Sequence, residues 1–254
     1  MRFRVLFILH FLMVMMVDAF GKNGHRAIAE IAQQGLSPKA LSRVKHLLDG
    51  KDVWMVANWA DDMRSLPEYK QADFWHWVDW NGQEEFKKRP ATPMKNIIEK
   101  IREFWEKLDS GSYKDPKSEA EALRWLIHLI GDVHQPLHVG RSEDQGGNKK
   151  IVKYFGKETN LHSVWDDHLV EGIQLSFRDL AVESQFFCEK QTVAGVDSVF
   201  DWADESFELL DQVYDVGNSE LEYMYVFHSA PILKRRICEA GLRLGLVMES
   251  IYGK

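Results

Sequence analysis

Cysteine is scarce in this chain, and no asparagine stands two residues before a serine or threonine. The two cysteines, Cys188 and Cys238, are too few for a zinc site built on thiolates. They can form one disulfide or remain two separate buried thiols, and their spacing leaves both alternatives open. Without an Asn-x-Ser/Thr sequon, N-linked glycosylation is not expected.

Basic residues are also fewer than acidic residues. The chain has 32 Lys and Arg against 39 Asp and Glu, which gives a formal net charge of −7. Non-specific binding to nucleic acid relies on Lys and Arg that neutralise phosphates, so this composition argues against it. An anionic substrate therefore needs a local source of positive charge in this protein.

Long apolar runs are missing except near the start, where Val5–Val17 follows two arginines. These 13 residues are too few to span a bilayer. Val17 and Ala19 occupy the positions that signal peptidase reads, so a signal over residues 1–19, cut after Ala19, is favoured over an uncleaved anchor. We expect one domain over residues 20–254, secreted or periplasmic in a bacterium, with no stable membrane association.

Apolar residues recur every three to four positions through most of the chain. Three capping residues precede a proline and are expected to open helices that end near Leu48, Leu108 and His134. These pairs are Ser37-Pro38, Thr92-Pro93 and Asp115-Pro116. Further helices are predicted at about 25–34, 53–65, 161–171, 176–188, 198–215 and 231–252. The fold class is mainly α, with at most a short β-hairpin near 150–155.

The stretch Trp125–His138 (WLIHLIGDVHQPLH) places histidines and an aspartate within an apolar helix. His128 and Asp132 lie one turn apart and opposite the main apolar stripe, so the helix is expected to be buried all round. Buried imidazole and carboxylate groups are costly unless something pairs with them. A metal ion meets this need. His134 is expected to be structural, because Pro136 breaks its helical spacing to His138.

The same spacing returns in His162 and Asp166, and other His and Asp residues stand among tryptophans. Nitrogen and oxygen ligands without thiolate are typical of catalytic zinc. Their number exceeds one tetrahedral site and predicts two or three ions. The candidates are His25, Asp61, His76, His128, Asp132, His138, His162 and Asp166.

In these residues the chain resembles the secreted, zinc-dependent, single-strand-specific nuclease and 3′-nucleotidase family of fungi and plants, the S-one/P-one class. That family is related to bacterial zinc phospholipase C, and the resemblance implies the same multi-helix fold. The matching blocks are Phe20-Gly-Lys-Asn-Gly-His25, Trp59-Ala-Asp61 with Arg64, His76-Trp-Val-Asp79, His128-Leu-Ile-Gly-Asp132, Gln135-Pro-Leu-His138, Gly146-Gly-Asn148, and Asn160-Leu-His162 with Trp165-Asp166.

The resemblance implies three zinc ions. Asp61, His76, His128 and Asp132 would hold the first, and His138, His162 and Asp166 the second. His25, shared oxygens of Asp61 and Asp132, and the main-chain amine and carbonyl of Phe20 would hold the third. Family members typically begin with tryptophan. The change to Phe20 keeps the main-chain ligands but leaves the packing of the ring open.

By the same resemblance, the protein would cleave single-stranded RNA and DNA to 5′-phosphorylated products and act on 3′-nucleotides, as a monomer. Asp79 would orient a metal-bound hydroxide for attack on phosphorus, and Arg64 would stabilise charge on the phosphate. Trp77 would stack an unpaired base. The alternatives are a surface salt bridge for Arg64, a cap for Asp79 and core packing for Trp77.

Two rival functions remain open at this point. One is a zinc-dependent phospholipase C, although the aspartate at position 166 argues modestly against it, since phospholipases of this superfamily tend to have glutamate there. The other is a secreted protein that binds zinc for stability without catalysis.

Overall fold

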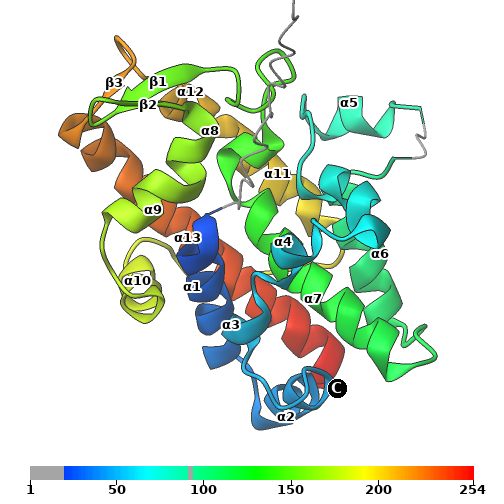
Figure 1. Cartoon of the computed structure of the whole chain (residues 1–254). Helices are drawn as coiled ribbons and strands as arrows, with labels where there is room; N and C mark the ends of the chain where they lie inside the picture. The colour runs from blue at the N-terminus through cyan, green and yellow to red at the C-terminus, as the bar shows by residue number, and fades with distance from the viewer. Residues whose placement is uncertain (1–19, 91–93) are drawn as a thin grey trace, which may run out of the picture.

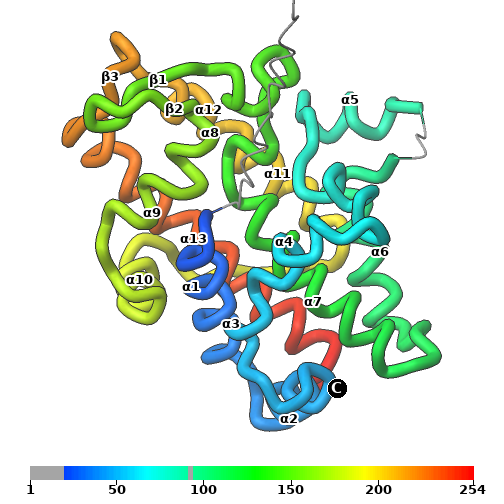
Figure 2. Tube along the Cα trace, in the orientation of Figure 1, coloured from blue at the N-terminus to red at the C-terminus, as the bar shows by residue number. Residues whose placement is uncertain are grey.

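The fold is organised around its last helix. The computed structural model describes residues 20–90 and 94–254, and the expected signal peptide lies outside this part. Helix α13 (Tyr223–Tyr252) runs diagonally through the molecule, with α1 (Gly21–Gln34) and α7 (Pro116–Val133) packed against it. The first and last helices thus lie side by side, blue beside red (Figures 1 and 2). The expectation of a mainly α single domain is confirmed.

The other helices cover this central group. The α-helices are α2 (Pro38–Leu47), α3 (Val53–Val56), α4 (Trp59–Met63), α5 (Gln83–Lys87), α6 (Ile97–Asp109), α8 (Leu161–Ser163), α9 (Leu169–Gly172), α10 (Phe177–Ser184), α11 (Ser198–Glu208) and α12 (Leu210–Val213). Two 3-10 helices, η1 (Pro67–His76) and η2 (Pro136–Val139), and a π-helix, η3 (Val164–His168), complete the set.

Helix starts follow the capping chemistry at two of the three predicted positions. Ser37 accepts a hydrogen bond from the third residue of α2, and Asp115 caps α7 in the same way. The start predicted at Thr92-Pro93 lies outside the described residues, but Met94–Asn96 are not helical and α6 begins at Ile97. There Asn96 and Glu99 form a reciprocal capping box.

Three other predicted helices have different bounds. The run 53–65 splits into α3 and α4, because the Ala57 carbonyl accepts a hydrogen bond from His128 instead of continuing one helix. The run 198–215 divides at Leu209 into α11 and α12. Helix α13 begins at Tyr223 and continues through Pro231, which marks the interior of this helix rather than its start. The helices η1 and α5 were not predicted.

A small sheet lies at one end of the molecule (Figure 1). Strands β1 (Ile151–Tyr154) and β2 (Lys157–Asn160) are antiparallel, so the predicted hairpin exists but extends to residue 160. The two-residue strand β3 (Glu220–Leu221) pairs in parallel with β1, which gives the order β2-β1-β3. Asn160 both ends β2 and caps α8, so the hairpin places the start of the helix that carries His162.

Helices α1 and α13 approach so closely that glycine is required between them. A Cβ atom on Gly241 would lie 2.6 Å from Cβ of Ile31, and one on Gly245 would lie 3.0 Å from the Ala32 carbonyl oxygen. Since α1 carries His25, the small residues of α13 set the depth at which this histidine lies.

We expect Gly241→Ala to destabilise the protein by about 1–3 kcal/mol, the usual cost of overpacking a core. The matched control is Gly35→Ala, where the added atom would be 3.5 Å from its nearest neighbour. Equilibrium denaturation by urea measures both. Equal stability of the two variants would contradict the close packing of α1 on α13.

The two cysteines form a disulfide. Cys188, after α10, is bonded to Cys238 in α13, and their Cα atoms are 6.0 Å apart. The alternative of two free thiols is therefore wrong. The described part of the chain contains no helix that is long and apolar enough to cross a membrane.

Candidate metal centre

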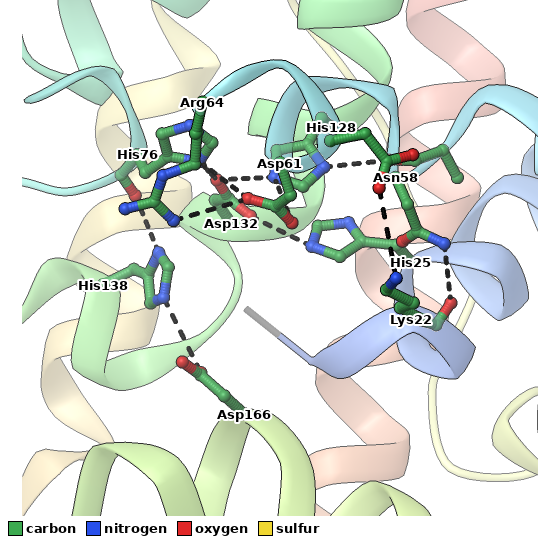
Figure 3. A network of polar contacts seen from close by, with 12 residues as sticks. Lys22, His25, Asn58, Asp61, Arg64, His76, His128, Asp132, His138 and Asp166 are labelled. Carbon is green, nitrogen blue, oxygen red and sulfur yellow. Dashed lines mark hydrogen bonds and ion pairs between the residues drawn. The ribbon is translucent and has the colours of Figure 1, made fainter. Parts of the chain in front are cut away.

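Five buried side chains from four elements converge in a first group (Figure 3). Its members are His25 on α1, Asp61 on α4, His76 at the end of η1, and His128 and Asp132 on α7. Asp132 is central, because its carboxylate oxygens lie 3.2 Å from Nε2 of His25, 2.8 Å from Nδ1 of His76 and 3.4 Å from Nε2 of His128. Asp61 lies 3.4 Å from Nε2 of His128 through its own carboxylate.

A second group lies beside the first. His138 on η2, His162 on α8 and Asp166 on η3 are all buried. The Asp166 carboxylate lies 3.7 Å from Nε2 of His138 and 3.0 Å from Nε2 of His162. Potential ligand atoms in this group, and in the sets His25–Asp61–His128 and His76–His128–Asp132, are within 4.8 Å of one another.

Backbone carbonyl groups orient three of the imidazole rings. Nδ1 of His128 lies 2.9 Å from the Ala57 oxygen, Nδ1 of His138 lies 2.7 Å from the His76 oxygen, and Nδ1 of His162 lies 2.6 Å from the Gly146 oxygen. Such bonds fix the proton on Nδ1 and leave Nε2 as a ligand atom. In all three rings Nε2 faces a carboxylate of its group.

The donor atoms of both groups fit metal binding. Several are buried and have no hydrogen-bond partner within the described part of the chain, which is costly for groups of this kind. They are Nε2 of His25, His76, His128 and His138, both carboxylate oxygens of Asp61, Oδ1 of Asp132 and Oδ2 of Asp166. Imidazole nitrogens and carboxylate oxygens that converge without forming hydrogen bonds to one another are typical ligands of a divalent transition metal.

The electrostatics keep the carboxylates ionised. Burial alone would raise the pKa of Asp132, but the nearby imidazoles of His128, His25 and His76 hold this pKa well below its usual range. The imidazoles near Asp166 oppose its burial and lower its pKa to about 2. Both carboxylates are therefore anionic at neutral pH and ready to bind a cation.

The start of the described chain lies against the second group. Phe20 is fully buried, which answers the question that the sequence left open about its ring. Gly21 approaches η3 so closely that an added Cβ would lie 2.9 Å from the Asp166 carbonyl oxygen. The main chain at Gly21 is thus next to η3, the helix that carries Asp166.

Arg64 lies at the first group. Its guanidinium is 3.5 Å from the Asp61 carboxylate and 3.4 Å from that of Asp73, and 22% of its side chain is exposed (Figure 3). This position favours a role at the site over a remote surface salt bridge. One face of the guanidinium contacts a candidate ligand while part of it still reaches solvent.

Asp79 and Trp77 follow His76 in an extended segment. The backbone N–H of Val78 donates to the His138 carbonyl at 2.9 Å, which ties this segment to η2. Burial raises the pKa of Asp79, whose carboxylate lies near Arg89 and Glu143. Trp77 is 42% exposed, so its ring is available to a ligand, and core packing is not its role.

Two site residues were missed by the sequence analysis. Gly131 lies beneath His25, where an added Cβ would be 2.8 Å from the ring nitrogen Nδ1. Gln135 donates its amide to Asp166 at 2.5 Å and accepts from the Leu137 N–H at 2.6 Å. Both stand inside the histidine-rich stretch, and a glycine within a buried helix was the available signal for the first.

Fold and site together define a helical protein with buried His and Asp groups that could hold metal ions. The chain belongs to the S1/P1 nuclease family, whose model matches residues 20–253. As a member of it, the protein is a hydrolase that acts on nucleic acid phosphodiester bonds.

Two of the relatives cover more than nine-tenths of the chain, and a third covers a little over half. Endonuclease 2 of Arabidopsis thaliana is 26% identical over 93% of this chain and 92% of the relative. Nuclease S1 of Aspergillus oryzae is 27% identical over 91% of each. Nuclease P1 of Penicillium citrinum is 31% identical over 59% of this chain and 58% of its own length.

Proposed function

We propose that this protein is a secreted phosphodiesterase with three zinc ions that cleaves single-stranded RNA and DNA to 5′-phosphorylated products and dephosphorylates 3′-nucleotides. The observation that carries the proposal is the convergence of eight buried His and Asp side chains, seven of which have at least one side-chain atom without a hydrogen-bond partner among the described residues. Membership of a nuclease family supplies the substrate class.

We assign Asp61, His76, His128 and Asp132 to the first ion, and His138, His162 and Asp166 to the second. His25 would hold the third with Asp61, Asp132 and the main chain of Phe20. Zinc is favoured because the ligands are imidazole and carboxylate without thiolate. When bound, the ions supply Lewis acidity, lower the pKa of water and provide the positive charge that the acidic chain lacks.

The remaining residues position the substrate. Arg64, next to Asp61, would hold the non-bridging oxygens of the scissile phosphate by charge-assisted hydrogen bonds. Asp79 would accept a hydrogen bond from the attacking water and fix its direction. Trp77 would stack the base beside the cleaved bond, which requires an unpaired nucleotide and so favours single strands.

The direct test is an assay of the purified chain 20–254 on denatured DNA, RNA, duplex DNA and phosphatidylcholine. Release of 5′-phosphorylated nucleotides from the two single-stranded substrates supports the proposal. Release of phosphocholine alone would make the protein a phospholipase C. Bound metal without hydrolysis of any substrate would make it a binding protein.

Trp77→Ala is expected to raise KM for single-stranded substrates about tenfold, because stacking of one base contributes about 1–3 kcal/mol. Trp77→Phe should keep most of the affinity. The control is Phe155→Ala, which removes another exposed aromatic ring, from the loop between β1 and β2. Steady-state kinetics on an oligonucleotide measures all three, and an unchanged KM in Trp77→Ala would exclude a stacking role.

A chain that still begins at Asp18 is expected to bind one ion fewer than a chain that begins at Phe20, and to be less active. A free α-amine has a pKa near 8 and can give up its proton to a metal, whereas a peptide nitrogen at the same position cannot act in this way. Elemental analysis of both chains measures the difference. Equal metal content would rule out Phe20 as a ligand.

A further inference from the structure

A second buried polar cluster lies directly behind the candidate metal centre and joins α7, α11 and α13. Arg243 on α13 donates two hydrogen bonds to Glu205 on α11, at 2.6 and 2.8 Å. Arg236, one further residue of α13, donates to Glu205 and Glu239 and to the Ser206 hydroxyl. Both arginines are buried and paired with carboxylates, so the cluster is a rigid, charge-compensated connection between these helices.

His134, the residue that follows α7, is held by this cluster through its ring atom Nε2 and its backbone carbonyl. Its Nε2 accepts from Arg243 at 2.9 Å, and its carbonyl oxygen accepts from Nε of Arg236 at 3.1 Å. Its Nδ1 donates to the Ile130 carbonyl at 2.7 Å. The backbone N–H donates to the Gly131 carbonyl, so the residue has no free polar group.

The position of His134 in the chain connects both ligand groups. Asp132 of the first group is two residues before it, and His138 of the second group is four residues after it. The next residue, Gln135, donates to Asp166 of the second group. The turn from Val133 to His138 therefore sets the spacing between the two groups, and His134 is the point where α13 holds this turn.

We propose that His134 is a positioning residue for the metal centre: α13, acting through Arg243 and Arg236, fixes the turn that carries ligands of both groups. This inference rests on the proposed metal-binding function. Buried ion pairs add little net stability, and their best attested use is to fix one geometry. Here the two arginines bond to His134, which lies in the turn between the two ligand groups. The geometry that they fix is therefore that of the metal centre.

Two substitutions at position 134 separate positioning from general stability. In His134→Gln the amide oxygen can replace Nε2 and accept from Arg243, while the bond to Ile130 is lost. In His134→Asn the amide nitrogen can replace Nδ1 and donate to Ile130, while the bond from Arg243 is lost. Each variant thus loses one buried hydrogen bond, but only His134→Asn loses the side-chain connection to α13, while the bond from Arg236 to the backbone carbonyl of residue 134 remains in both.

The measurement is zinc affinity and stoichiometry, by competition with a chromophoric chelator, for wild type and both variants. We expect His134→Asn to bind zinc roughly 10- to 100-fold more weakly, which is the usual effect of losing a residue that supports the metal ligands without binding the metal. His134→Gln should stay close to wild type. The zinc affinity of both ligand groups should fall. Equal affinity in all three proteins would overturn the inference, whereas a wild type that binds no zinc would overturn the proposed function instead.

Arg243→Lys is the second variant if His134→Asn does not fold. A single ammonium cannot contact both Glu205 and His134 as the guanidinium does, so the same loss of zinc affinity is expected. Val44→Ala, which removes methyl groups from a buried residue of α2, is the control for lost stability. Equal zinc affinity in Arg243→Lys and Val44→Ala would contradict the positioning role.

Discussion

Asp132→Asn should lower nuclease activity on the order of a thousandfold or more and remove metal from the first group. Loss of a residue that merely orients a ligand costs roughly 10- to 100-fold, and Asp132 contacts three histidines directly. Asparagine keeps the shape but has no negative charge, so it cannot neutralise a divalent cation or keep His25, His76 and His128 in place. Elemental analysis and an assay on denatured DNA measure both effects.

The control for this variant is Asp62→Asn. Asp62 also stands beside the site in sequence, but its side chain is exposed and its ion pair with Lys22 is 4.0 Å long. We expect full activity and full metal content in Asp62→Asn. Unchanged metal content and activity in Asp132→Asn would mean that the first group does not bind a metal ion.

Removal of metal by a chelator should abolish activity and lower the stability of the folded chain. A ligand that binds only the folded state stabilises it by about 4 kcal/mol at a thousandfold excess over its Kd. The loss should be large because the chelator leaves donor atoms of eight buried side chains without the ion that satisfies them. Thermal unfolding with and without chelator measures this change.

Zinc should restore both properties, and magnesium should not. Magnesium prefers six oxygen ligands, whereas the two groups offer mainly imidazole nitrogen. A chelator-treated protein with unchanged Tm and unchanged activity would contradict a structural and catalytic role for metal.

The sequence predicted well which His and Asp side chains would be buried together, because the spacing within two of the pairs is local. His128 and Asp132 are four residues apart on a helix, and this spacing together with the apolar surroundings showed that both would be buried. The pair His162 and Asp166 was found in the same way, although the structure places Asp166 in the π-helix η3 instead of a regular α-helix. Asp166 faces its group all the same.

The features that the sequence did not predict depend on contacts between distant segments. The Ala57 carbonyl that orients His128 is 71 residues away in the chain, and its role is visible only after folding. The strand β3 consists of two residues that pair with β1 from far along the sequence. The disulfide stayed open for the same reason, since local spacing does not show that Cys188 and Cys238 meet.

The 3-10 helix η1 shows a different limit. It lacks a strong apolar period, so it gave no helical signal in a search for repeats of three to four residues. Nevertheless it ends at His76 and places this side chain in contact with Asp132. Its place among tryptophans marked His76 as a candidate where periodicity could not.

A crystal of the chain that begins at Phe20, measured on both sides of the zinc absorption edge, tests the metal centre most directly. Three anomalous peaks are expected: two within the first group around Asp61 and Asp132, one of them beside His25 and the Phe20 main chain, and a third among His138, His162 and Asp166. No anomalous peak at either group in active protein would contradict the account.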